Sequence, residues 1–136
     1  MKPELEEALF RDFPNLYKNL AYFECDDGWE PLIRRLSEKL ETMIKALDYP
    51  YEGKVQLLAT DPPDWIFPYA QQVKEKFGGL RFYMSSGTDE MYEAINQAES
   101  ESYLTCEACG APGESRSGGW IKTLCDECEA KSGRRR

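Results

Sequence analysis

Apolar residues recur at helical spacing along residues 32–47, and this repeat is the strongest secondary-structure signal in the chain. Pro31 suits the first turn of a helix there, and Pro50 ends it. We expect this helix to form the spine of the core, with Glu41 and Lys45 paired on its outer face. Steps of four and three place five apolar residues on one side: Leu32, Leu36, Leu40, Met43 and Leu47.

A shorter helix is predicted at the start of the chain. Pro3 and the acidic residues that follow it are typical of a helix N-terminus. Leu5, Leu9 and Phe13 then fall on one side of the helix, and Pro14 stops it. A third helix is predicted from a cap at Thr88 or Asp89 to about Ser102. Its inner face holds Met91, Ile95 and Ala98.

Residues 73–84 (VKEKFGGLRFYM) predict a β-hairpin. If Gly78-Gly79 forms a two-residue turn, one face pairs Phe77 with Leu80, Glu75 with Phe82 and Val73 with Met84. We expect that face to be buried and the opposite face to be exposed and cationic. The exposed face would pair Lys76 with Arg81 and Lys74 with Tyr83.

The first half of this hairpin has an alternative interpretation. Tyr69, Val73 and Phe77 also fit helical spacing, with Gly78 just beyond the C-cap, so residues 66–77 are open between helix and strand. Upstream, residues 54–60 (KVQLLAT) are compatible with a strand. Asp61 and Asp64 flank a Pro-Pro turn, and turn or cap roles are favoured over acid–base catalysis because the chain has no histidine.

Four cysteines near the C-terminus predict a metal site. Cys106 and Cys109 form one C-x-x-C pair, and Cys125 and Cys128 form a second. Two such pairs can occupy the four corners of a tetrahedron around one Zn²⁺ ion at about 2.3 Å per bond. Zinc is favoured over an iron–sulfur cluster, a redox pair or disulfides. Such a closed site leaves no position for water, so we expect one structural Zn²⁺ ion.

The local sequence around the cysteines predicts how each pair is presented. Gly110 suits a tight turn after the first pair, and Glu129–Lys131 has a helical pattern, which places the second pair in the first turn of a C-terminal helix. A turn, a hairpin and a helix in that order make a treble clef. The motif resembles GATA-type fingers and the finger of regulators that enter the secondary channel of RNA polymerase.

These elements together predict an α+β fold, in which helices pack on a small antiparallel sheet and a treble-clef or ribbon-like zinc module follows. We divide the chain into a body (1–104), a zinc module docked on it (105–131) and a basic tail (132–136). The module should dock rigidly because only three residues separate the third helix from Cys106.

Composition narrows the function. Seventeen basic and 25 acidic residues give a net charge of −8, which disfavours general nucleic-acid binding. No signal segment or membrane span is evident, so we expect a cytoplasmic protein. The closing arginines, residues 134–136, are interpreted as a solvated tail.

Five segments resemble an uncharacterised family of small bacterial, phage and prophage proteins. The similarity implies a prokaryotic, cytoplasmic protein associated with a mobile element, and it assigns no catalytic residue. The segments are Phe23–Trp29 (FECDDGW), Gln72–Tyr83 (QVKEKFGGLRFY), Ala98–Glu101 (AESE), Cys106–Gly113 (CEACGAPG) and Gly119–Cys125 (GWIKTLC). Cys25 lies in the first of them and is interpreted as a buried apolar residue, since no histidine could activate its thiol.

We therefore expect a non-enzymatic zinc protein that acts by binding a partner protein. A phage- or prophage-encoded inhibitor or regulator of a host system is one protein of this kind. The expected partner-binding face is Lys74, Lys76, Arg81 and Tyr83. The alternative is a binder of nucleic acid or of the transcription machinery that uses the finger and the cations of that face. An enzyme built on carboxylates or Cys25 is the least favoured class, and no membrane or small-molecule partner is expected.

Overall fold

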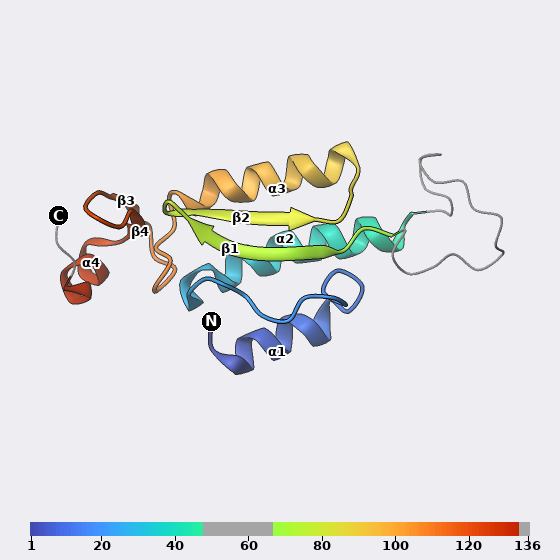
Figure 1. Cartoon of the computed structure of the whole chain (residues 1–136), viewed down its shortest axis with the longest axis horizontal. Helices are drawn as coiled ribbons and strands as arrows, with labels where there is room; N and C mark the ends of the chain where they lie inside the picture. Colours follow the sequence, from blue (N-terminus) through green and yellow to red (C-terminus); the bar gives the residue numbers. More distant parts are fainter. Residues whose placement is uncertain (48–66, 134–136) are drawn as a thin grey trace.

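The structure is a computed structural model, and it describes residues 1–47 and 67–133. Helices α2 and α3 lie along the β1–β2 hairpin, α1 lies on the other side of that hairpin from α3, and a small C-terminal unit lies at one end (Figure 1). The α+β prediction is confirmed. In chain order the elements are α1 (Pro3–Asp12), η1 (Asp27–Trp29), α2 (Glu30–Lys45), β1 (Ala70–Lys76), β2 (Gly79–Met84), α3 (Asp89–Ser102), β3 (Glu114–Arg116), β4 (Lys122–Leu124) and α4 (Asp126–Ser132).

Helix α2 is the spine of the core, as its apolar repeat predicted. Leu32, Leu36 and Leu40 are buried, whereas Met43 and Leu47 are only partly buried. A helix has 3.6 residues per turn, so a stripe with steps of four and three drifts around the axis. The rest of the buried face is formed by Ile33, Ser37, Glu41 and Ile44.

Glu41 is the exception to the predicted pattern, because the proposed outer-face pair with Lys45 is wrong. Glu41 is buried, and its Oε1 accepts a hydrogen bond from the backbone N–H of Leu16 at 2.9 Å. Its Oε2 accepts one from the side-chain amide of Asn15 at 2.6 Å. The chain after α1 is irregular and packs on α2, so the buried N–H of Leu16 has no partner within a helix or strand. The Glu41 carboxylate supplies the acceptor that this N–H needs.

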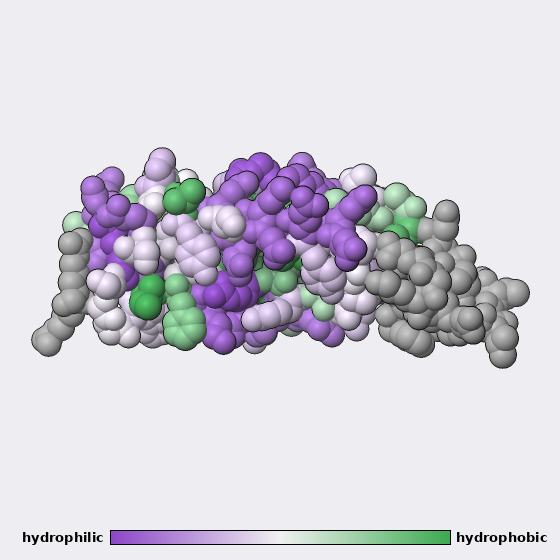
Figure 2. All heavy atoms as spheres, turned by 90° about the horizontal axis from the view of Figure 1, so that it is seen from above, coloured by the Kyte–Doolittle hydropathy of each residue, from purple (hydrophilic) through white to green (hydrophobic). Residues whose placement is uncertain are grey.

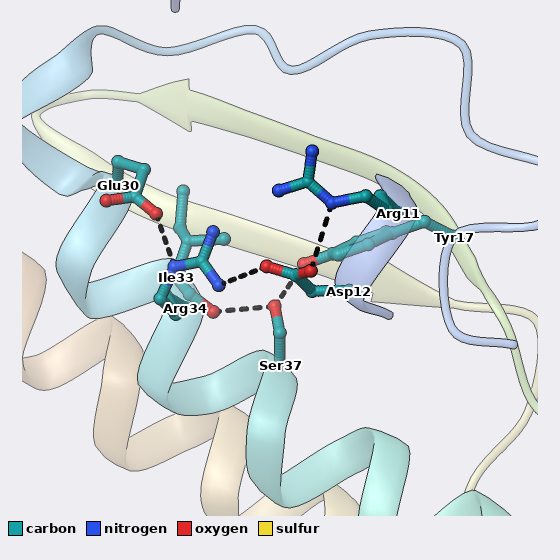
Figure 3. Close-up of polar contacts among 7 residues, drawn as sticks. All are labelled: Arg11, Asp12, Tyr17, Glu30, Ile33, Arg34 and Ser37. Atoms are coloured by element: carbon teal, nitrogen blue, oxygen red, sulfur yellow. Dashed lines mark hydrogen bonds and ion pairs between the residues drawn. The ribbon is translucent and has the colours of Figure 1, made fainter. Parts of the chain in front are cut away.

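Polar contacts join the end of α1 to α2 (Figure 3). Arg34 reaches Asp12 through Nη1 and Glu30 through Nε, each at 2.8 Å. Below them, the buried hydroxyl of Tyr17 hydrogen-bonds Ser37 Oγ, which in turn donates to a carbonyl one turn back in α2. The predicted first helix is therefore confirmed and fixed against the spine. The prediction for α3 is also confirmed, with Thr88 Oγ1 accepting from Met91 N–H as the cap.

The β1–β2 hairpin is confirmed, but its predicted register is wrong. Lys76 pairs with Gly79, Lys74 with Arg81 and Val73 with Phe82. The two turn residues are therefore Phe77 and Gly78, at φ values of 54° and 82°, and not Gly78-Gly79. A two-residue turn with positive φ at both positions matches the right-handed twist of the strands. The strand assignment of Ala70–Lys76 also rules out the helical alternative for those residues.

Packing explains why the turn forms one residue earlier than predicted. A Cβ on Gly79 would lie 2.3 Å from the Tyr103 ring, so this glycine is needed where α3 approaches the strand and not in the turn. The observed register differs from the predicted one by two positions. Because strand side chains alternate with a period of two, Val73 and Phe82 stay on the buried face and Lys74 and Arg81 stay on the other.

Phe77 is the residue whose environment changes. It was predicted to be buried, and as a turn residue it is 65% exposed. A bulge between Ala70 and Gln72 interrupts the alternation of side chains along β1. Ala70 and Val73, three positions apart, are therefore both buried.

Several sequence predictions lie outside the described residues. These are the strand at 54–60, the turn at Asp61 and Asp64, the helix end at Pro50 and the arginine tail. Among helices in the described ranges, none has the length and apolarity required to cross a bilayer. The division into body, module and tail stays an interpretation.

Replacing Phe82 tests whether this face of the hairpin is core. Phe82 is 6% exposed, so Phe82→Ala should lower the free energy of unfolding by roughly 3–5 kcal/mol, as measured by denaturant titration. Tyr83→Ala is the matched control, because its ring on the opposite face is 44% exposed and should lose far less. Equal losses from the two variants would contradict the assignment of faces.

Candidate metal centre

The four predicted cysteines converge at one point. Their Sγ atoms all lie within 4.8 Å of one another, although the two pairs are separated by fifteen residues of chain. The Sγ atoms of Cys109 and Cys125 are 3.7 Å apart. Four thiolates around a single ion at about 2.3 Å per bond would be about 3.8 Å apart. The cluster is therefore positioned to bind one metal ion with four sulfur ligands.

A tight turn presents the first pair. Gly110 has a φ of +85°, a conformation that glycine adopts without strain, and its N–H donates to the Cys106 carbonyl at 2.9 Å. The chain then folds back, so that Cys106 N–H donates to the Ala111 carbonyl at 2.7 Å. The predicted role of Gly110 is confirmed.

A helix start presents the second pair, also as predicted. Cys125 is the N-cap of α4, and its Sγ accepts a hydrogen bond from Cys128 N–H at 3.4 Å. Cys128 lies in the first turn of that helix. The short β3–β4 hairpin lies between the two pairs and brings Cys125 back to the first turn. The order of elements is thus turn, hairpin, helix.

The acidities of the thiols show why this cluster suits a cation. Burial opposes ionisation of Cys106, but backbone N–H groups of Cys125, Cys109 and Ala108 lower its pKa to about 7. The neighbouring sulfurs have the opposite effect on Cys128. Its contact with Cys125, followed in size by its contact with Cys109, raises its pKa to about 12. Neighbouring thiolates repel one another, so a bound cation would favour deprotonation of the four thiols.

The metal-binding turn is docked on the body through the segment at Asp26–Trp29. Gly28 N–H donates to the Glu107 carbonyl at 2.7 Å, and the Trp29 indole N–H donates to the Thr105 carbonyl at 2.9 Å. A Cβ on Gly28 would lie 2.3 Å from the Cys106 carbonyl oxygen. The backbones therefore touch, and only glycine fits at this position.

Charged side chains close the same junction. The buried carboxylate of Glu107 accepts from Asp26 N–H at 3.0 Å, and Lys122 Nζ lies 3.3 Å from its other oxygen. Burial raises the pKa of Glu107, whereas the charge of Lys122 lowers it. Lys122 also lies 3.6 Å from the carboxylate of Asp26, so strand β4 is tied to both sides of the junction.

A second contact joins β4 to the tip of the β1–β2 hairpin. The hydroxyl of Thr123 donates to the Gly78 carbonyl at 2.6 Å. A Cβ on Gly78 would be 3.3 Å from the backbone of Lys122, so the turn packs closely against the strand. The metal-binding unit therefore meets the body at two places, one at Gly28 and one at Gly78.

The predicted partner-binding face is smaller than expected. Arg81 is only partly exposed, and its guanidinium is bound by Glu99 at 2.9 Å and by the Tyr103 hydroxyl at 3.1 Å. Its charge is thus compensated within the protein. Lys76 remains exposed, Lys74 is partly exposed, and Tyr83 lies on the same face of the hairpin. Binding of a partner by these residues remains a prediction.

Sequence reasoning missed a group of exposed apolar residues beside these lysines. Phe77, Trp120 and Ile121 line one groove together with Lys74 and Lys76. Trp120 is 68% exposed, in a loop between β3 and β4. The sequence does contain a signal for this group, because each of two Gly-Gly pairs has a large aromatic neighbour. Phe77 directly precedes the first pair, and Trp120 directly follows the second.

No family model, curated protein or solved structure matches this chain. The similarity to phage and prophage proteins therefore stays a prediction.

The fifth cysteine is not part of the cluster. Cys25 is buried, as predicted, and burial raises its pKa to about 12. At neutral pH it is a protonated thiol, and its carbonyl accepts a hydrogen bond from the N-terminal ammonium group at 2.7 Å. These features fit a packing role and not a nucleophile.

Removing one ligand tests the metal centre. Purified protein should contain one metal ion per chain by elemental analysis, and Cys125→Ser should lose it and melt at a lower temperature. The effect should be large, because metal binding at such sites contributes on the order of 10 kcal/mol to folding. Cys25→Ala is the control and should keep its metal. A Cys125→Ser variant with full metal content and unchanged melting would refute the site.

The junction at Gly28 can be tested separately. Gly28→Ala places a methyl group against the backbone of Cys106 and should destabilise the protein by about 1–3 kcal/mol or more. Gly119→Ala is the matched control, because nothing lies within 4 Å of its Cβ position and its stability should change little. Thermal unfolding of the two variants side by side measures the difference. Equal melting temperatures would mean that the close approach at Gly28 is not required.

Proposed function

We propose that this protein is a non-enzymatic, cytoplasmic zinc protein that acts by binding a partner protein. The observation that carries the metal-binding part of the proposal is the convergence of four sulfur atoms within 4.8 Å. Their spacing favours one ion over an iron–sulfur cluster, in which the thiolates bind different iron atoms and lie farther apart. Zinc is the metal that most often takes four thiolates in a tetrahedral structural site.

The treble clef is the module type that this proposal implies. It is supported by the order of turn, β3–β4 hairpin and α4, and by the placement of Cys125 and Cys128 at the start of α4. When bound, the ion would be held by Cys106, Cys109, Cys125 and Cys128 and would crosslink the turn to the helix. Such a site has no free coordination position, which supports a structural and not a catalytic role.

Binding of a partner protein is supported by the surface. Tyr22, Phe77, Leu104 and Trp120 are all large apolar residues that are more exposed than buried. Exposed aromatic residues of this kind are enriched where proteins bind one another. The similarity to phage and prophage proteins extends the proposal, since a small protein of that origin would suit an inhibitor or regulator of a host system.

The alternative is binding to nucleic acid or the transcription machinery. Lys74 and Lys76 beside exposed aromatic rings favour it, because bases stack on aromatic side chains and phosphates pair with lysine. The net charge of −8 opposes it, and Arg81 is already paired with Glu99.

The proposal is tested by identifying a partner and reconstituting the complex. Tagged protein, with its zinc content confirmed, is recovered from its native host, and co-purifying proteins are identified by mass spectrometry. We expect one host protein to form a stable complex with the purified chain in size-exclusion chromatography. Micromolar or tighter binding to a DNA or RNA oligonucleotide at about 0.15 M salt, lost when Lys74 and Lys76 are changed to Glu, would favour the alternative instead.

A further inference from the structure

We infer that the groove between the Phe77–Gly78 turn and the Gly118–Ile121 loop binds a short acidic segment of the partner, anchored by an apolar side chain. This inference rests on the proposed function and specifies the site and the chemistry of the partner. We call this surface the tip groove. It has a volume of about 400 Å³ and is formed by two elements that are more than forty residues apart in the chain.

Phe77 is the first indication that the tip groove has a function. It adopts a φ of +54° at a turn position where glycine, asparagine or aspartate is strongly preferred. Its ring is also 65% exposed, so it adds little to the core. A residue that is unfavourable for the turn and does not stabilise the core is most simply explained by a contact with another molecule.

Trp120 and Ile121 form the opposite wall. Trp120 is 68% exposed, and Ile121 is also exposed, although apolar residues of this size are usually buried in a protein of this length. Seen from above, apolar side chains stand among polar ones at the end of the molecule where the metal-binding unit lies (Figure 2). Trp and Phe on facing walls can hold an apolar side chain between them.

The two walls are held in fixed relation, so the tip groove exists before a partner binds. The Thr123 hydroxyl donates to the carbonyl of Gly78, the residue next to Phe77, at 2.6 Å. Strand β4, which carries Thr123, leads straight into the metal ligand Cys125. A preformed groove lowers the ordering cost of binding.

Charge selects an acidic occupant. Lys74 and Lys76 line the groove, and Lys76 Nζ lies 5.7 Å from the centre of the Phe77 ring. Glu75 also lines the groove and accepts a hydrogen bond from Gly78 N–H at 2.7 Å, so two lysines and one carboxylate leave a net charge of +1 there. On a protein with a net charge of −8, two lysines beside an apolar groove offer an acidic segment a local site of attraction. A long polyanion such as a nucleic acid would meet the surrounding negative charge, so a short peptide segment is favoured.

Synthetic peptides of defined composition test the inference. Three sets of dodecapeptides carry the same central Trp or Leu, flanked by Asp and Glu, by Lys and Arg, or by Ser and Gly; a twelve-nucleotide oligothymidylate represents nucleic acid. Binding to the full zinc-loaded chain is measured by fluorescence anisotropy of the labelled probe. We expect acidic peptides to bind most tightly, with affinity falling as salt is raised. Equal affinity for all three sets, absence of peptide binding, or preference for the oligonucleotide would overturn the inference.

Three variants locate the binding. Phe77→Asn suits the turn, so it should keep or raise the melting temperature while weakening the acidic peptide on the order of tenfold or more. Trp120→Ser should weaken binding to a similar extent. Tyr22→Ser is the control, because Tyr22 is 57% exposed but does not line the groove, and it should bind as the unmodified protein does. Equal losses from Tyr22→Ser would place the peptide elsewhere.

The same variants separate this inference from the proposed function. If the reconstituted host complex forms equally well with the Phe77→Asn/Trp120→Ser double variant, the tip groove is not the partner site and the proposed function stands. If the unmodified zinc-loaded protein forms no complex with a host protein, the proposed function fails. Loss of the host complex in the double variant but not in Tyr22→Ser supports both.

Discussion

The contact of Gly28 with the first metal-binding turn is the constraint on which the arrangement of the chain depends. Its N–H bonds the Glu107 carbonyl, and no side chain fits between the two backbones. Trp29, the next residue, is buried in the core and also bonds the turn through its indole nitrogen. Polar contacts of Asp26 cross the same junction, since its N–H donates to the Glu107 carboxylate and its own carboxylate lies near Lys122 Nζ. The position of the cysteine cluster relative to the core follows from these contacts.

Local periodicity was enough to predict the helices, whereas the hairpin register required tertiary information. The apolar repeat of α2 and the Thr88 cap of α3 are properties of short stretches of sequence. The hairpin allows two registers with the same buried face, so its alternation could not distinguish them. Tyr103, more than twenty residues away, decides between them because it occupies the space beside Gly79. The burial of Glu41 was unpredictable for the same reason, since its partner is a backbone N–H on another segment.

The candidate site shows the same division. The C-x-x-C spacing predicted four converging sulfurs because metal geometry fixes it locally, and the structure places them together. The tip groove has no such local signature, because Phe77 and Trp120 become neighbours only when the hairpin meets β4. The alternation of apolar and charged residues along the hairpin was enough to identify the cations near the groove. It could not predict that Arg81 pairs with Glu99 on α3.

The short connection between α3 and Cys106 has a consequence for how the chain can change in length. Leu104 and Thr105 are both fixed through their carbonyls, one by Gly113 N–H and the other by the Trp29 indole. One residue added to a helix turns everything after it by about 100° and advances it by about 1.5 Å. A single insertion or deletion in α3 would therefore rotate both cysteine pairs together relative to the core and break the contacts of the metal-binding unit with Gly28 and Gly78. A change in length around Gly119 would leave the cluster in place but would alter one wall of the tip groove. The length of α3 therefore sets the orientation of the metal centre relative to the core, whereas the length of that loop sets only the shape of the groove.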